Sequence, residues 1–286
     1  PYRGCAHGCS YCYARPGHEY LGFTAGLDFE TKVLVKHRAP ELLRAWLARP
    51  SWRPETIAFS GVTDCYQPAE RQFQITRGCL AVAAECRQPI GIITKNALVT
   101  RDLDLLSDLA GHGAVRVCLS ITSLDAKFAR VMEPRTSSPE ARLRAMKELN
   151  EAGVPTYLML APVIPGLNDS EIPAILAAAR DAGAKGAGFT LLRLPTTVKD
   201  VFLDWLRRSY PDRYNKVEAL LRSTRAGALS DSQFGRRHRG TGNMAGLIAD
   251  TFHLWSKKLG LDGDSPPLNC EAFEPPQITS GQLRLF

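Results

Sequence analysis

Short, continuous apolar runs alternate with longer amphipathic segments from residue 57 to Leu194. The apolar runs are rich in β-branched residues, which favours buried parallel strands, and the segments between them repeat apolar residues at helical spacing. The pattern therefore predicts a parallel sheet covered by helices. The expected strands are Ile57–Ser60, Ile90–Thr94, Val115–Ile121, Thr156–Ala161 and Gly186–Leu192. The expected helices are Glu41–Leu47, Phe73–Cys86, Leu103–Ala110, Pro139–Ala152 and Glu171–Ala182.

After Leu194 the pattern becomes helical, with expected helices Val198–Ser209, Arg213–Thr224 and Asn243–Leu259. Beyond Gly260 the chain is Pro-rich and polar, which is typical of an extended tail. We therefore expect an α/β fold in three parts. These are a partial (β/α)6 TIM-type barrel over residues 1–195, a helical extension over 196–260 and a tail over 261–286.

Polar or loop-forming residues follow each expected strand. In a β/α barrel the chemistry collects at the C-terminal ends of the strands, so these positions predict a functional site. The residues are Thr63, Asp64, Lys95, Ser120, Thr122, Ser123, the loop 165–169 and Arg193.

Three of the eight cysteines crowd into residues 5–12, as Cys5, Cys9 and Cys12. Thiolates spaced in this way bind three irons of a [4Fe–4S] cluster and leave the fourth iron without a protein ligand. Gly4 and Gly8 permit the tight backbone of such a loop, which spans residues 4–13. A structural zinc site is the alternative, but it requires a fourth nearby Cys or His, and His7 lies out of phase for that task.

The other five cysteines match no iron–sulfur spacing and are expected to be buried thiols. Free thiols indicate a reducing compartment, so a cytoplasmic location is expected. No apolar run approaches the ~20 residues of a membrane span, and we expect no membrane partner and no signal peptide. Pro1 falls in a functional loop, so a segment with a further strand is expected to precede it.

The chain carries a net charge of +7, which favours a polyanionic partner. Arg236, Arg237 and Arg239 form a basic loop that we expect to contact DNA or RNA, with a solvated basic surface as the alternative. The chain ends with Gln282, Leu283, Arg284, Leu285 and Phe286. This pentapeptide resembles the motif by which bacterial DNA-processing enzymes bind the sliding clamp, and a tail that caps its own core is the alternative.

The cysteine triplet, with Tyr11 directly before its third cysteine, resembles the signature of the radical S-adenosylmethionine (SAM) superfamily. The stretches 63–68 and 161–169 and the pair Thr94-Lys95 resemble the branch related to spore photoproduct lyase, the DNA repair photolyase-like proteins. The resemblance implies a [4Fe–4S] cluster, SAM, and an electron donor such as a flavodoxin or ferredoxin. It implies reductive cleavage of SAM to a 5′-deoxyadenosyl radical that abstracts hydrogen from a substrate.

The resemblance also implies roles for single residues. Tyr11 is expected near the adenine, Lys95 at the methionine carboxylate and Ser120 at the ribose. Thr63 and Asp64 are expected near the methionine amine. The residues expected to border the adenine through their backbone are Val163, Ile164, Pro165 and Gly166.

One position departs from the family pattern. Gly61 stands where spore photoproduct lyase has its hydrogen-donating cysteine, so thymine-dimer repair is not carried over. Cys65 and Cys118 are the remaining candidate donors, although neither occupies that position. The leading hypothesis is a radical SAM enzyme acting on nucleic acid. The alternatives are a radical SAM enzyme acting on a peptide or small molecule, and a non-catalytic iron–sulfur or zinc protein recruited to the clamp.

Overall fold

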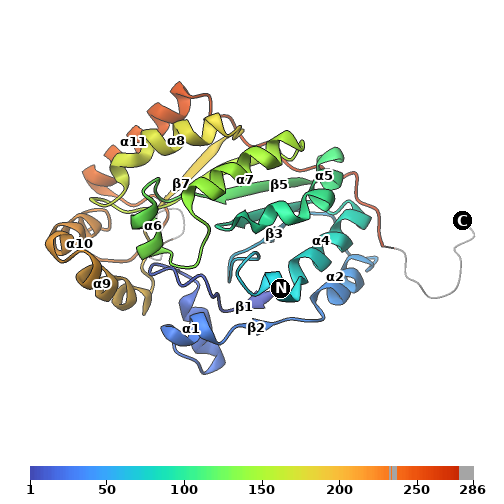
Figure 1. Cartoon of the computed structure of the whole chain (residues 1–286), viewed down its shortest axis with the longest axis horizontal. Helices are drawn as coiled ribbons and strands as arrows, with labels where there is room; N and C mark the ends of the chain where they lie inside the picture. The colour runs from blue at the N-terminus through green and yellow to red at the C-terminus, as the bar shows by residue number, and fades with distance from the viewer. Residues whose placement is uncertain (232, 234–236, 277–286) are drawn as a thin grey trace, which may run out of the picture.

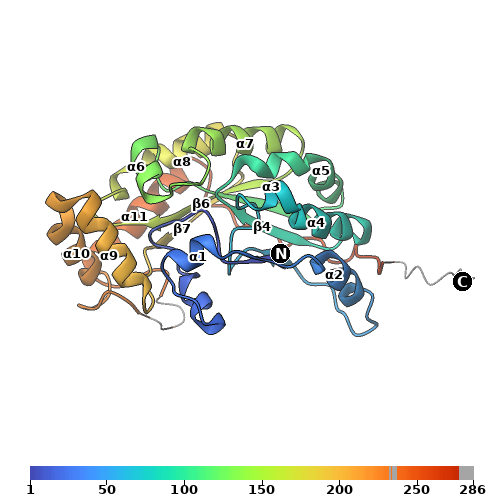
Figure 2. The same ribbon diagram turned by 60° about the horizontal axis from the view of Figure 1, so that its bottom comes forward.

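The computed structural model describes residues 1–231, 233 and 237–276. Its main sheet holds five parallel strands in the order β3-β4-β5-β6-β7, so each strand pairs with the next one along the chain. Helices cover the outer face of this sheet (Figures 1 and 2). The predicted α/β class with a parallel sheet is confirmed. The strands are β3 (Ile57–Phe59), β4 (Ile90–Thr94), β5 (Val115–Ser120), β6 (Thr156–Val163) and β7 (Ala187–Leu191). The covering helices are α4 (Ile75–Cys86), α5 (Leu103–Gly111), α7 (Pro139–Glu151) and α8 (Ile172–Asp181).

The main core lies between the sheet and these helices. Alternate strand residues such as Ile92, Val117 and Leu158 point into it and are buried. The other residues of each strand face the opposite side, where polar side chains such as Ser120 are found. This alternation leaves the concave side of the sheet free for chemistry.

The long elements match the sequence prediction to within a few residues, whereas several short elements were not predicted. A helix of one or two turns or a strand of two residues is too short to show a periodic pattern. The unpredicted elements are the strand pair β1 (Tyr2–Arg3) and β2 (Leu34–Val35), the helices α1 (Leu27–Thr31), α3 (Glu70–Phe73) and α6 (Ala126–Met132), and 3₁₀ turns at Arg15–Leu21, Ala97–Asp102, Asp169–Glu171 and Pro211–Arg213. Helix α2 (Ala39–Leu47) starts two residues before the predicted helix.

The helical extension consists of α9 (Val198–Ser209), α10 (Tyr214–Ser223) and α11 (Gly242–Lys258). Phe202, Leu206 and Val217 of this extension share a second buried cluster with Cys9 and Tyr11. Helix α11 packs against α8 and β7. The extension therefore packs directly on the loop that carries the cysteines.

Residues 261–276 form no helix or strand and run along the N-terminal ends of the strands. The amide of Ala187 donates to Leu261 O (3.0 Å), Asn269 N to Gly113 O (3.0 Å) and Glu274 N to Cys86 O (2.9 Å). This part of the tail is extended and tied to the edge of the sheet that lies opposite the strand C-termini. The predicted clamp motif, including Gln282, Leu283, Leu285 and Phe286, lies outside the described residues. Within the described part, no helix has the length and apolar composition needed to cross a membrane.

Candidate active site

A cavity of about 440 Å³ lies at the C-terminal ends of all five strands. The N-terminal loop with the three cysteines forms one part of its wall, the strand ends form most of the rest, and Phe29, Arg237 and His238 complete it. The residues lining it at the strand ends are Ser60, Gly61, Thr63 and Asp64 after β3, Ile93, Thr94 and Lys95 at β4, Ser120 at β5, Met159, Ala161 and Pro162 of β6, and Thr190 to Arg193 at β7.

Cys5, Cys9 and Cys12 all line this cavity, and all three are free thiols. Gly4 and Gly8 have φ angles of 78° and 71°, so glycine suits the two tight points of the loop. A Cβ at Gly4 would lie 2.8 Å from His18 Cε1 and 3.0 Å from Phe29 O, so the loop has no room for a side chain there. Three soft donors around one cavity fit a thiolate-ligated iron–sulfur cluster.

The three thiols do not converge as ligands of a single metal ion do. Within the described residues, no group of three Cys, His, Asp or Glu side chains has that arrangement. A [4Fe–4S] cluster places each thiolate on a different iron, so its ligands need not meet at one point. Burial raises the pKa of the Cys5 thiol to about 12 and the pKa values of Cys9 and Cys12 above their ordinary value. Binding iron therefore has to displace these protons.

Two buried side chains fix the cysteine loop from outside the cavity. Arg15 donates to Cys9 O from Nε (3.2 Å) and Nη2 (2.8 Å), and its Nη2 also pairs with Glu30 Oε1 at 2.6 Å. Gln67 Nε2 donates to Gly4 O (3.0 Å), while its Oε1 accepts from Ala6 N (2.9 Å). Both side chains are fully buried, and the bonds of Arg15 to Cys9 O and of Gln67 to Gly4 O are shielded from competing water. The loop is thus held in place before any ligand binds.

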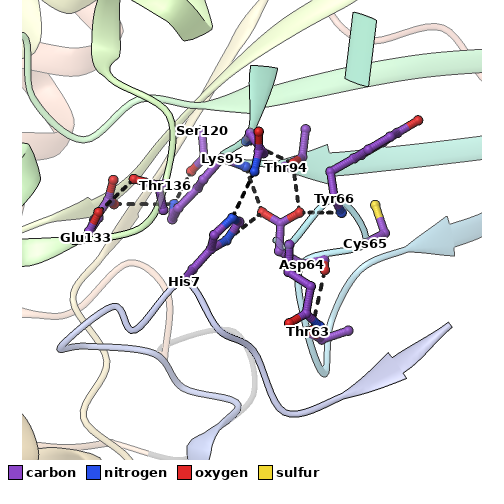
Figure 3. A network of polar contacts seen from close by, with 12 residues as sticks. His7, Thr63, Asp64, Cys65, Tyr66, Thr94, Lys95, Ser120, Glu133 and Thr136 are labelled. Atoms are coloured by element: carbon purple, nitrogen blue, oxygen red, sulfur yellow. Dashed lines mark hydrogen bonds and ion pairs between the residues drawn. The ribbon is translucent and has the colours of Figure 1, made fainter. Parts of the chain in front are cut away.

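The Asp64 carboxylate links three elements at the cavity wall (Figure 3). It accepts hydrogen bonds from Thr94 Oγ1 (2.7 Å) and Lys95 N (2.8 Å), and His7 Nδ1 lies 3.5 Å from its Oδ2. Asn96 Nδ2 lies 3.2 Å from His7 Nε2. Because an amide nitrogen can only donate, His7 Nε2 accepts this hydrogen bond, and the ring hydrogen is on Nδ1, which faces Asp64. Burial lowers the pKa of His7 and keeps the ring neutral. Through its contacts with Asn96 and Asp64, His7 therefore stabilises the cysteine loop.

The Lys95 ammonium lies at the centre of the predicted site. Its Nζ donates to Ser120 Oγ (2.5 Å) and to Ala161 O (3.1 Å), and it lies 5.7 Å from the centre of the Tyr11 ring. The pairing of β6 with β7 shifts register between Leu160 and Val163, and the Ala161 carbonyl lies in this irregular stretch. The structure therefore brings Tyr11, Lys95 and Ser120 together, as predicted for a shared site.

Behind Lys95 lies a buried ion pair that the sequence did not indicate. Arg142 Nη2 pairs with Glu133 Oε2 at 2.5 Å, and Glu133 Oε1 accepts from the Tyr11 hydroxyl and from Thr122 Oγ1 (3.0 Å). The Lys95 ammonium lies 3.8 Å from Glu133 Oε1. Burial favours the neutral acid, but the charges of Arg142 and Lys95 and the hydrogen bonds outweigh it, so the pKa of Glu133 is held at about 2. Glu133 thus connects the tyrosine of the cysteine loop with the lysine of β4.

Of the remaining predicted residues, some line the cavity and others do not. Thr63 lines the cavity and donates to Gly4 O (2.8 Å), and Arg237 lines it from the basic loop. Arg239 is exposed and does not line it, while Arg236 lies outside the described residues. The candidate hydrogen donors Cys65 and Cys118 do not line the cavity. Gly61 does line it, and apart from its chain neighbours no described residue has an atom within 4 Å of the place a Cβ would take.

The segment expected to border the adenine does not line the described cavity. Strand β6 contributes Met159, Ala161 and Pro162 instead. The expected residues, Val163, Ile164, Pro165 and Gly166, come directly after these. Among the residues that sequence reasoning did not assign to the site, His7, Gln67, Glu133 and Arg142 are buried polar groups. A buried ionisable side chain cannot be recognised from a single sequence unless its partner is known.

Residues 1–179 match the family model of the Radical SAM superfamily. An uncharacterized protein of Mycobacterium tuberculosis is 39% identical over 223 residues, which cover 77% of this chain and 66% of the relative. An uncharacterized protein of Methanocaldococcus jannaschii is 32% identical over 170 residues, covering 59% of this chain and 61% of the relative. The chain thus spans slightly less than two thirds of the length of these relatives.

Solved structures of spore photoproduct lyase share the fold. One, complexed with dinucleoside spore photoproduct, superimposes with a TM-score of 0.64 at 17% identity, over 90% of this chain and 72% of the lyase. Another, with bound AdoMet and dinucleoside spore photoproduct, gives a TM-score of 0.60 at 17% identity over the same shares of the two chains. At this identity the likeness shows the fold alone.

Proposed function

Because this chain belongs to the radical SAM superfamily, whose cofactors are a [4Fe–4S] cluster and S-adenosylmethionine, we propose that it is an enzyme that abstracts hydrogen from a nucleic-acid substrate. The observation that supports this proposal best is the cavity itself. Three thiols of one loop and the polar ends of five parallel strands line the same space. Cys5, Cys9 and Cys12 are the proposed ligands of the cluster.

When bound, the reduced cluster supplies the electron that cleaves SAM and yields the hydrogen-abstracting 5′-deoxyadenosyl radical. The chain's own residues orient the cofactor. Lys95 presents its ammonium beside Ser120 at the end of β5, which suits a carboxylate of the methionine moiety. Asp64 is the one carboxylate among the residues lining the described cavity, and it suits the methionine amine. Tyr11 is held by Glu133 and offers a ring face near Lys95 for the adenine.

The nucleic-acid substrate is supported by charge and by the solved relatives. Arg193, Arg237 and His238 line the cavity, and the chain carries a net charge of +7. Spore photoproduct lyase binds a dinucleoside in the same fold. A peptide or small-molecule substrate is the competing proposal, and a non-catalytic iron–sulfur protein is the other.

Dimer repair by the mechanism of spore photoproduct lyase is not proposed. Gly61 occupies the position of the cysteine donor and leaves open space there, while Cys65 is buried against Phe59 O at 3.6 Å. The step that follows hydrogen abstraction therefore uses a different hydrogen donor from that of spore photoproduct lyase. A separate electron donor, such as a flavodoxin or ferredoxin, is proposed to reduce the cluster.

The test is SAM cleavage by anaerobically reconstituted, reduced protein, measured as 5′-deoxyadenosine. Single-stranded DNA, duplex DNA, RNA and a peptide mixture are compared at equal mass. We expect a nucleic acid to raise the rate several-fold over the uncoupled rate. Stimulation by peptides alone would replace the nucleic-acid proposal with its competitor, and the absence of any 5′-deoxyadenosine would leave a non-catalytic iron–sulfur protein.

A bacterial sliding clamp is a second proposed partner. The tail is tied to the body as far as Glu274, at the ends of the strands opposite the cavity. Deleting residues 282–286 is expected to abolish micromolar clamp binding and to leave iron content unchanged. Loss of folding on deletion would instead show that these residues serve the protein's own core.

A further inference from the structure

The end of β7 and the loop before α11 form one basic wall of the cavity. Arg193 follows β7, and Arg237 and His238 come from the helical extension. The loop is fixed to the strand because Leu191 N donates to His238 O (3.0 Å). Arg225 Nη2 also donates to Leu192 O (2.9 Å), which joins the end of α10 to the same strand. The extension therefore contributes side chains to the same cavity as the cysteines.

The two guanidinium groups on this wall, of Arg193 and Arg237, carry charges of the same sign, and the neutral His238 ring accepts at Nε2 from Arg237 Nε (3.1 Å). The pKa of Arg193 is lowered mainly by burial and secondly by the charge of Arg237. The pKa of His238 is lowered mainly by burial, with smaller effects of the charges of Arg193, Arg237 and Arg225. Asp64 is the only carboxylate lining the described cavity, and it is already bonded to Thr94 and Lys95. Two guanidinium groups that line one cavity repel each other, and an anion bound between them would offset this repulsion. This wall is thus arranged to receive a negative group.

Donor geometry and the neighbouring ring identify the group. Guanidinium forks match the paired oxygens of a phosphate, and an imidazole adds another donor. The Tyr13 ring, 52% exposed, lies 5.8 Å from Arg193 Cζ and offers a flat face beside the cations. Stacking on an aromatic face next to a basic wall is how proteins hold single-stranded nucleotides. We propose that Arg193, Arg237 and His238 form a subsite for a phosphate group of the substrate, with Tyr13 stacking on an adjoining base. The assignment of this phosphate to a polynucleotide rests on the proposed function above.

The experiment uses reconstituted protein under anaerobic conditions and two probes, a fluorescent single-stranded oligodeoxynucleotide and inorganic phosphate. Arg193→Gln is expected to weaken oligonucleotide binding about tenfold or more, the range for a lost charged hydrogen bond. It should also reduce the slope of log affinity against log salt by about 0.7, the value for one phosphate contact on a single strand. Arg193→Lys keeps the charge and should restore the slope while recovering affinity only in part.

Arg208→Gln is the matched control, since Arg208 is exposed on α9 and pairs with Asp204 away from the cavity. It should bind both probes like the parent, and unchanged iron content in every variant shows that the fold is intact. Equal oligonucleotide and phosphate binding by Arg193→Gln and the parent would overturn the subsite and leave the nucleic-acid function standing. Phosphate binding that is lost in Arg193→Gln, with no oligonucleotide binding by the parent, would keep the subsite and overturn that function. If the parent binds neither probe, both proposals are wrong.

Discussion

Replacing Glu133 with Gln tests the buried network that connects the cysteine loop to β4. The change keeps the shape of the side chain but removes the negative charge that faces Arg142 at 2.5 Å. Removing one partner of a buried ion pair costs about 3–5 kcal/mol, because the other charge stays buried. The depression of the Glu133 pKa from 4.5 to about 2 gives a similar figure, about 3 kcal/mol. We therefore expect the free energy of unfolding to fall by about 3 kcal/mol at pH 7.

The sign of the pH dependence follows from the depressed pKa. A carboxylate whose pKa is lower in the folded state stabilises the fold above its unfolded pKa, and the stabilisation is lost as the pH falls from about 4.5 towards 2. The difference between Glu133→Gln and the parent should therefore be smaller at pH 4 than at pH 7, as measured by urea unfolding of the metal-free chain. Glu140→Gln, an exposed residue paired with Arg144, is the control and should change stability by less than about 0.5 kcal/mol. A difference below about 1 kcal/mol for Glu133→Gln at pH 7, or one that grows on acidification, would refute this account of the network.

Three further changes test Lys95 at the cavity wall and two residues, Gly4 and Gln67, that shape the cysteine loop. Lys95→Ala should keep its iron but bind SAM about 10-fold or more weakly in equilibrium dialysis, because a charged hydrogen bond is lost. An unchanged affinity for SAM would show that Lys95 does not bind the methionine carboxylate. Gly4→Ala should retain less iron than Gly153→Ala in metal analysis, since both positions have positive φ but only the Cβ at Gly4 meets the backbone; equal iron would contradict the crowding argument. Gln67→Leu and Gln88→Leu each remove a buried, bonded amide, and both should lower the midpoint of urea unfolding, but only the change at Gln67 should lower iron retention. Equal loss of iron in both would assign the effect of Gln67 to general stability.

The sequence was sufficient to predict the sheet and the elements that cover it. Strand β4 was predicted at Ile90–Thr94 and helix α9 at Val198–Ser209, and both have these bounds in the structure. Each has a pattern that is local and long enough to reveal its period. Helix α6, at Ala126–Met132, spans only two turns, so its period was not apparent. The predictable part of the fold is thus the part specified by neighbouring residues.

The same distinction applies to the site. Asp64, Lys95 and Ser120 were predicted because they lie at or just after the ends of strands that meet at one edge, and all three line the cavity. Glu133 acts on Tyr11, which lies 122 positions earlier in the chain, and nothing in the local sequence indicates that contact. Contacts of this kind become visible only when the chain is folded.

The claim that this chain binds a [4Fe–4S] cluster and cleaves SAM is tested most directly by measuring both in one preparation. The protein is reconstituted anaerobically with iron and sulfide and reduced in the presence of SAM. The protein should bind about four irons with matching sulfide per chain, as a thiolate-ligated [4Fe–4S] centre does, and should form 5′-deoxyadenosine. Cys9→Ala should lose both, whereas Cys86→Ala, a buried thiol at the end of α4, should keep both. Stoichiometric zinc without sulfide, or a Cys9→Ala protein that still produces 5′-deoxyadenosine, would contradict the claim.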